Sequence, residues 1–238
     1  MLFGVLALGP ATAGAAKAKG KTAAGGAGGA AAAPSSSGET GSSADAPAAA
    51  GAPPADSSPK ADLKKSNEAL DKFLKKQKPG WSPEGEAQKQ EIRKIVGSFL
   101  DYGELAKRAL AKHWDGLTPS QRTEFVNTLR DLVERSYLRQ LRGDPNYTMT
   151  YEKEEKQGQE AAVFSTLHTT SRGKKVELSI EYKMVWKKKW LVYDVVTDEQ
   201  SMLENYRAEF NKIINKESFD ALLKRMKSKL ADKDDKAE

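Results

Sequence analysis

The sequence predicts an α+β fold, in which N-terminal helices precede a four-stranded antiparallel curved sheet and C-terminal helices pack on one face of that sheet. Apolar residues recur at helical spacing before residue 142 and after residue 201, and they alternate with polar residues in between. Turn residues separate the alternating segments, which is typical of strands joined by hairpins. A curved sheet has a concave face, which must be filled by side chains alone or by side chains and a ligand.

The N-terminal quarter of the 238-residue chain differs in composition from the rest. Leu2–Leu8 is a short apolar run followed by small residues, so we interpret residues 1–15 as a truncated signal peptide. Residues 16–60 contain no large apolar residue, which predicts a disordered linker rich in Ala, Gly, Ser and Pro. We expect a single domain over residues 61–230 and a charged tail over residues 231–238.

Four helices are expected before the sheet. The first covers residues 62–78 and is amphipathic, Ser82 caps the second, and the third covers residues 104–114 after a break near Asp101. The fourth has the clearest signal, which is Thr118-Pro119-Ser120-Gln121. It combines a Thr cap, Pro at the first helical position and Gln three residues after the cap, so it predicts a capping box.

The alternating segments predict four strands and the turns between them. The expected strands are Tyr147–Tyr151, Ala161–Thr169, Val176–Met184 and Trp190–Thr197. The polar stretch from Lys156 to Gln159 supplies the first turn, and residues 171–174 supply the second. Helical spacing returns after Asp198 and continues to Leu230, which predicts the C-terminal helices.

Composition excludes several kinds of functional site. The chain has no Cys, so it has no disulfide, thiolate zinc site, Fe–S cluster or Cys nucleophile, and two His leave little material for a His-rich metal site. We therefore expect no metal and no cofactor. We read His113 as a helix C-terminal residue and His168 as a surface residue. Lys and Arg number 39 against 33 Asp and Glu, and both signs alternate along the chain, as on a solvated surface.

One group of residues resembles an acid/base site. Asp194, Tyr193 and Tyr182 would place a carboxylate and phenols at an apolar sheet face, as in isomerase-type enzymes. Adjacent strand residues point to opposite faces, so we favour Asp194 as an ion-pair or helix-cap partner and expect no catalytic residue. A small-molecule enzyme using Asp194 and Tyr182 is the alternative.

A second alternative is a nucleic-acid module. Lys187-Lys188-Lys189 lies between Trp186 and Trp190, and interleaved aromatic and basic residues can hold a single strand. The alternating segments on either side favour a hairpin tip instead, with the lysines in water. We therefore expect no nucleic-acid partner.

Six short motifs, in order and at matching spacing, resemble one protein family. They are Leu100-Asp101-Tyr102, Leu110–Trp114, Leu117–Phe125, Ser136-Tyr137, Trp190–Val195 and Ser201–Phe210. Through them the sequence from Ile92 to Leu223 resembles the periplasmic phospholipid-binding proteins of the MlaC or toluene-tolerance type. It departs from the family pattern at Glu199-Gln200, where Glu-Gly is usual.

The resemblance implies a shuttle that binds phospholipid in the periplasm and helps to maintain outer-membrane lipid asymmetry. Such proteins exchange the lipid with an outer-membrane lipoprotein complex and with an inner-membrane ABC transporter carrying an MCE protein. The resemblance also implies an apolar cavity between the sheet and the helices, which holds the acyl chains.

The candidate lipid-binding residues are the large apolar and aromatic side chains of the predicted sheet face and of the neighbouring helices. On the strands they are Val163, Leu167, Val176, Leu178, Ile180, Tyr182 and Met184, and on the helices Phe99, Tyr102, Leu105, Leu129, Leu132, Val133, Tyr137, Tyr206 and Phe210. Arg207 is the candidate contact for the headgroup phosphate. We expect weak selection among headgroups, because a headgroup at a cavity mouth stays in water.

Overall fold

The structure, a computed structural model, describes residues 51–74, 76, 86–140, 147–171 and 174–231. The predicted signal peptide, most of the predicted linker, the Ser82 cap and nearly all of the charged tail lie outside the described residues. The last residues of the predicted linker contact the sheet, because the Ser57 hydroxyl accepts a hydrogen bond from Trp190 Nε1 at 3.2 Å.

The described helices correspond to those predicted. They are α1 (Pro59–Leu74), α2 (Glu86–Gly97), α3 (Tyr102–Leu110), a 3-10 turn (Ala111–His113), α4 (Pro119–Gln140), α5 (Met202–Lys216) and α6 (Phe219–Ala231). The capping box of α4 is confirmed. Gln121 N–H donates to Thr118 Oγ1 at 3.2 Å, and Thr118 N–H donates to Gln121 Oε1 at 3.0 Å.

Side-chain caps also set where α3 and α5 begin. Asp101 caps α3, because its carboxylate accepts a hydrogen bond from Glu104 N–H at 2.9 Å. Ser201 caps α5 in the same way, accepting from Glu204 N–H at 3.0 Å. The break that the sequence predicts near Asp101 is therefore a helix cap.

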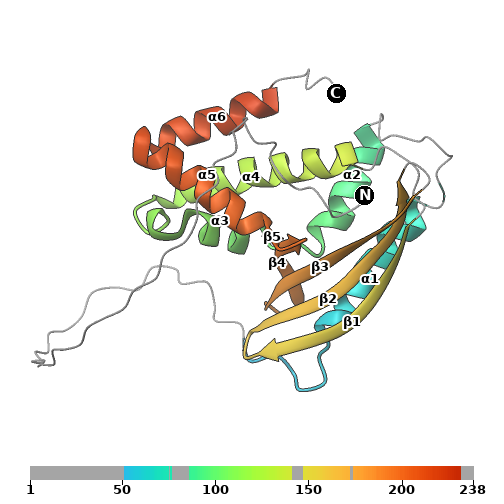
Figure 1. Ribbon diagram of the computed structural model, residues 1–238. Coiled ribbons are helices and arrows are strands. Elements are labelled where there is room, and N and C mark those ends of the chain that lie inside the picture. Colours follow the sequence, from blue (N-terminus) through green and yellow to red (C-terminus); the bar gives the residue numbers. More distant parts are fainter. Residues whose placement is uncertain (1–50, 75, 77–85, 141–146, 172–173, 232–238) are drawn as a thin grey trace, which may run out of the picture. The chain divides into compact units, whose positions relative to one another are not determined.

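The sheet is antiparallel with the order β1-β2-β3-β4-β5 (Figure 1). The strands are β1 (Tyr147–Gln157), β2 (Glu160–Ser171), β3 (Lys174–Trp186), β4 (Trp190–Thr197) and β5 (Gln200–Ser201). The prediction of four strands omitted β5, which has two residues and carries no alternation. Asp198 and Glu199, with φ of 47° and 66°, form the turn before it, at the position where the sequence departs from the family pattern.

The edge strand β1 is longer than the sequence predicts. It continues past Tyr151 to Gln157, through residues of which most are charged and exposed. The register shifts between Tyr151 and Glu154, so the polar half of β1 carries a bulge. Charges and bulges are usual on an edge strand, because they prevent pairing with other chains, and they hide the alternation on which the prediction depended. Gly158, with φ of 61°, begins the predicted turn to β2.

The described helices divide into two groups. We call the sheet with α1 and α2 the sheet layer, because buried residues of α1 and α2 share one cluster with β2, β3 and β4. We call α3 to α6 the helical layer, because these helices contact one another (Figure 1). The prediction placed C-terminal helices on the sheet, and α5 does pack against β4. The apolar face of the sheet, however, is covered by α1 and α2.

Within the described part of the chain, two segments connect the layers. The segment between α2 and α3 pairs with β4, since Val192 N–H donates to Phe99 O at 2.7 Å and Asp101 N–H donates to Val192 O at 2.8 Å. The second connection runs from β4 to the start of α5. Among the described residues, no helix combines the length and the apolar content that crossing a membrane requires.

Candidate functional site

The sheet layer contains most of the candidate strand residues in one buried cluster. Val163, Leu167, Ile180, Tyr182 and Met184 are all at most 2% exposed and share this cluster. They alternate along β2 and β3, so they lie on one face of the sheet. Leu178 packs against the cluster as a half-buried residue, and Val176 is half-buried nearer the strand end.

The other side of this cluster comes mainly from α1 and α2. Leu63 and Leu70 of α1, and Ile92 and Val96 of α2, are at most 1% exposed. Of the candidate helix residues, only Phe99 belongs to this cluster. The α1 residues are not among the wall residues predicted from the sequence. The apolar stripe of the first amphipathic helix could have indicated them. Helical periodicity, however, does not show which apolar stripe packs against the sheet.

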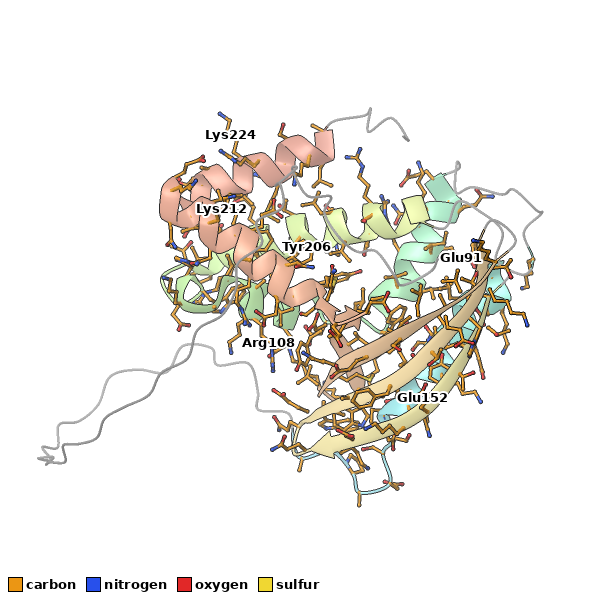
Figure 2. All side chains as sticks on the ribbon, in the orientation of Figure 1. Glu91, Arg108, Glu152, Tyr206, Lys212 and Lys224 are labelled. Atoms are coloured by element: carbon orange, nitrogen blue, oxygen red, sulfur yellow. The ribbon has the colours of Figure 1, made fainter. Side chains whose placement is uncertain are left out.

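The remaining candidate helix residues pack in the helical layer. Those with buried side chains are Tyr102, Leu105, Leu129, Val133, Tyr206 and Phe210, and Leu132 is half-buried. Phe210 contacts Phe125 edge to face at a centroid distance of 5.4 Å and stacks on Tyr206 at 5.3 Å. Figure 2 shows Tyr206 on α5 among these helices. The side chain of Tyr137 lies outside the described residues.

Buried polar groups interrupt the apolar cluster of the sheet layer. Asn67 of α1 is 7% exposed and Ser165 of β2 is 3% exposed. Asn67 Nδ2 donates to the Tyr151 hydroxyl at 2.6 Å, whereas Asn67 Oδ1 has no hydrogen-bond partner among the described residues. Burial raises the pKa of the Tyr151 and Tyr182 hydroxyls above the ordinary value for tyrosine, so both keep their protons at neutral pH.

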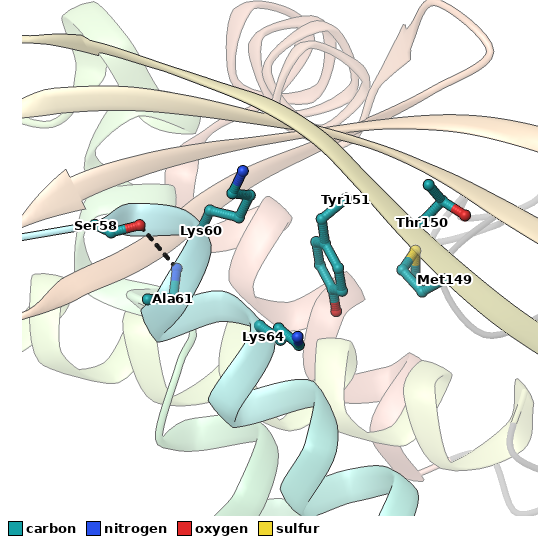
Figure 3. Close-up of a pocket in the computed structure, with 7 residues that line it drawn as sticks. All are labelled: Ser58, Lys60, Ala61, Lys64, Met149, Thr150 and Tyr151. Carbon is teal, nitrogen blue, oxygen red and sulfur yellow. Dashed lines mark hydrogen bonds between the residues drawn. The ribbon is translucent and has the colours of Figure 1, made fainter.

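A pocket opens at the edge of the sheet layer, between the first turns of α1 and the edge strand β1 (Figure 3). Its volume is about 550 Å³, and its lining is formed by Ser58, Lys60, Ala61, Lys64, Met149, Thr150 and Tyr151. Tyr151 and Met149 also pack against the apolar cluster, so the pocket borders that cluster directly. This pocket could not be predicted from the sequence, because its two sides, at residues 58–64 and 149–151, are far apart in the chain.

The structure assigns Asp194 to the cap and ion-pair role that the sequence favoured. Its side chain is fully buried, and it accepts hydrogen bonds from Ser201 Oγ at 2.7 Å and Leu203 N–H at 2.9 Å. Lys183 Nζ lies 3.6 Å from the same carboxylate. Asp194 pairs with Lys183 across the sheet, whereas Tyr182 is in the apolar cluster on the opposite face. The two members of the predicted acid/base group therefore do not meet.

Tyr193, the third member of that group, contacts different residues again. The Arg108 guanidinium lies over its ring at 4.0 Å from the centroid, and its hydroxyl donates to Glu160 Oε2 at 3.4 Å. Burial, partly offset by Arg108, raises the pKa of Tyr193 to about 12. This phenol is therefore neutral at physiological pH. It contacts Arg108 and Glu160, which form an ion pair with each other.

Arg207, the candidate headgroup contact, lies in the helical layer with its guanidinium engaged. Its Nε donates to the Arg108 carbonyl at 3.1 Å, and its Nη1 donates to Glu204 Oε1 at 2.6 Å. The structure does not bring Arg207 into the pocket between α1 and β1.

The lysine run is a hairpin tip, as the strand pattern indicated. Lys187 Nζ lies 2.7 Å from Asp101 Oδ2, and Lys189 Nζ donates to Ser98 O at 2.5 Å. Trp190 is 1% exposed and packs edge to face with Trp186 at 5.6 Å. A buried Trp190 offers no ring face on which a nucleic-acid base can stack.

The two histidines occupy structural positions. His168 is a partly exposed strand residue beside Glu177, 3.2 Å from Oε1, and His113 Nε2 lies 2.9 Å from Asn211 Oδ1. Within the described ranges, no group of three or more His, Asp or Glu is placed to hold a metal ion.

Comparison with known proteins identifies a family model, a curated relative and a solved structure that are similar to this chain. A family model described as MlaC protein matches residues 64–228 of the chain. The intermembrane phospholipid transport system binding protein MlaC of Haemophilus influenzae is 23% identical over 140 residues, which covers 57% of this chain and 64% of that protein. The chain therefore matches less than two thirds of the length of this curated relative.

The third match is a solved structure of the phospholipid-binding protein from Ralstonia solanacearum in complex with a phospholipid. It covers 72% of this chain and 96% of that protein, with a TM-score of 0.58 and 19% identity. At this identity the likeness establishes the fold. The family model spans well over half of the chain and includes all six motifs between Leu100 and Phe210. On these grounds, the chain belongs to the MlaC family.

Proposed function

We propose that this protein binds phospholipid in the periplasm and carries it between outer- and inner-membrane complexes, without performing chemistry on it. The observation that carries the proposal is the apolar cluster of the sheet layer, to which three strands and two helices contribute. Membership of the MlaC family and the fold of a phospholipid-binding protein support the same function.

The energetics require a large apolar surface. Moving two acyl chains of roughly 15 methylenes each from a membrane to water costs on the order of 20 kcal/mol of free energy, at ~0.8 kcal/mol per CH₂. A binding protein must return most of this free energy. In the described residues the cluster between the sheet and α1 provides aliphatic and aromatic surface next to a pocket. We infer that the acyl chains enter this cluster and that α1 moves or repacks to admit them.

The proposed partners are those of the family. The lipid would be exchanged with an outer-membrane lipoprotein complex and with an inner-membrane ABC transporter carrying an MCE protein, which supplies the energy. The test is delivery of a labelled phospholipid from the loaded protein to membranes that contain this transporter. Faster lipid transfer to these membranes than to protein-free membranes would support the transporter as a partner. Equal transfer to both membranes would contradict it.

The first experiment is native mass spectrometry, with lipid extraction, on the protein purified from a Gram-negative periplasm. A stoichiometric adduct with the mass of a phospholipid is the expected result. A stable fold with a clean apo mass, before and after incubation with phospholipid vesicles, would contradict the proposal.

A matched pair of variants identifies which layer holds the lipid. Leu178 and Leu132 are both half-buried candidate residues, but Leu178 packs against the cluster of the sheet layer and Leu132 lies on α4. Burying an amide against acyl chains is unfavourable, so Leu178→Gln should lower phospholipid occupancy. Leu132→Gln should leave occupancy unchanged. The opposite result would move the lipid site to the helical layer.

A further inference from the structure

The pocket between α1 and β1 is lined by basic side chains, whereas the apolar cluster contains no charged residue. Lys60 and Lys64 lie one turn apart on α1, and both line the pocket. Among the described residues, neither ammonium group forms an ion pair. Some other lysines do pair, such as Lys187 with Asp101 and Lys227 with Glu124. The pocket is therefore lined by two ammonium groups that have no ion-pair partner among the described residues.

Two carboxylates on these elements are already engaged in hydrogen bonds. Glu154 Oε2 accepts hydrogen bonds from Ser58 Oγ at 2.7 Å and from Lys60 N–H at 2.8 Å, so it occupies the N-terminal end of α1. Asp71 accepts a hydrogen bond from the Tyr147 hydroxyl. The helix end consequently offers little to an anion, and binding in the pocket would depend on the two lysine side chains.

A tyrosine hydroxyl lies in the same pocket. In Figure 3 the Tyr151 ring points from β1 toward α1 and Lys64 lies on the facing side of the helix. The Tyr151 oxygen accepts a hydrogen bond from Asn67, which leaves its own O–H free to donate. Two ammonium groups and a phenol donor are a suitable set for phosphate oxygens.

The pocket is also continuous with apolar surface. Met149 and Tyr151 line the pocket and pack against the cluster that contains Leu63 and Leu70. A ligand with a phosphate in the pocket and hydrocarbon chains beyond it would match both surfaces. We propose that Lys60 and Lys64 bind the phosphate of the carried phospholipid, so that its headgroup lies between α1 and the edge strand β1. This inference rests on the proposed function and replaces Arg207 as the headgroup contact.

The test compares two double variants that remove the same charge. Lys60→Ala combined with Lys64→Ala removes the pocket lysines. Lys212→Ala combined with Lys224→Ala is the control, because these lysines lie on α5 and α6, form no ion pair among the described residues, and are labelled in the helical layer in Figure 2. Circular dichroism should show the same fold for both variants. The probes are dihexanoyl phosphatidylglycerol, dihexanoylglycerol, which lacks the phosphate, and inorganic phosphate.

The pocket variant should bind dihexanoyl phosphatidylglycerol about tenfold more weakly than the wild type, since two partly exposed charge contacts are lost. Its affinity for dihexanoylglycerol should be unchanged, and added salt should narrow the difference between wild type and variant. The control variant should bind both lipids like the wild type. Inorganic phosphate alone should bind far more weakly than the phospholipid.

Three outcomes would overturn the assignment. They are equal affinity of the two double variants for the phospholipid, an equal loss of affinity for dihexanoylglycerol, and inorganic phosphate binding as tightly as the phospholipid. The last outcome would make the pocket a site for free phosphate. A wild-type protein that binds neither lipid would instead contradict the proposed function, so the two failures are distinguishable.

Discussion

The helical layer and the sheet layer bury polar groups differently. In the helical layer Thr128 Oγ1 donates to the Glu124 carbonyl at 2.8 Å, and Glu134 accepts from the Tyr102 hydroxyl at 3.2 Å with Arg93 nearby at 3.5 Å. In the sheet layer Asn67 Oδ1 has no such partner, and a pocket lies alongside. These polar groups of the helical layer are thus paired, whereas the sheet layer has a buried polar atom without a partner next to a pocket.

The largest effect is expected from breaking the aromatic packing of the helical layer. Phe210→Ala should lower the free energy of unfolding by about 3–5 kcal/mol, because Phe210 is 2% exposed and contacts Phe125 and Tyr206. Urea denaturation measures the change. Phe219→Ala is the matched control, since Phe219 also contacts Phe125 but is only half-buried. An equal loss for both variants would contradict the view that the Phe210 site is a closed core.

The second prediction concerns the joint between the layers. Asp194→Asn should lower the free energy of unfolding by about 1–3 kcal/mol. The carboxylate accepts hydrogen bonds from both Ser201 and Leu203, and the single oxygen of the amide can keep only one of them. Phospholipid occupancy in the folded fraction should not change. Loss of occupancy at unaltered stability would show that Asp194 belongs to the ligand site after all.

The third prediction concerns Glu134, the buried carboxylate of the helical layer. Burial raises its pKa, so the folded state holds the proton more tightly than the unfolded chain does. Its contribution to stability is therefore greatest below the ordinary Glu pKa and falls as the pH rises through the raised value. Glu134→Gln should make stability less dependent on pH over this range, while changing it at pH 7 by no more than about 1 kcal/mol.

Urea titrations of the wild type and Glu134→Gln at several pH values between 4 and 8 measure this effect. The Gln side chain still accepts a hydrogen bond from Tyr102, which makes the substitution conservative in packing. Parallel stability curves for the two proteins would contradict a raised pKa at Glu134.

The smallest effect is expected at the hairpin tip, where Lys187 connects the sheet layer to α3. Its ammonium lies 2.7 Å from Asp101 and 3.4 Å from Glu104, but the side chain is 43% exposed. Lys187→Ala should therefore lower the free energy of unfolding by less than about 1 kcal/mol. Because Asp101 also caps α3, a larger loss would indicate that the ion pair maintains the cap. Amide hydrogen exchange at Glu104 separates these cases.

Much of the secondary structure follows from the sequence alone, since local interactions determine it. The capping box at Thr118, the cap at Asp101 and the alternation along β3 each depend on residues a few positions apart. The six motifs likewise indicate the family without reference to the fold. The length of β1 was not predictable, because its second half, residues 152–157, is mostly charged and has no hydrophobic alternation.

Only the tertiary structure decided which apolar stripe faces the sheet. Periodicity predicted apolar faces on the first helix and on the C-terminal helices alike, and the fold brought Leu63 and Leu70 to the sheet while it stacked Phe210 on Tyr206. The pocket depends on the same choice, because Lys64 and Tyr151 meet only through the packing of α1 on β1. A sequence determines its local structure through neighbouring residues, but contacts between distant residues form only when the whole chain packs.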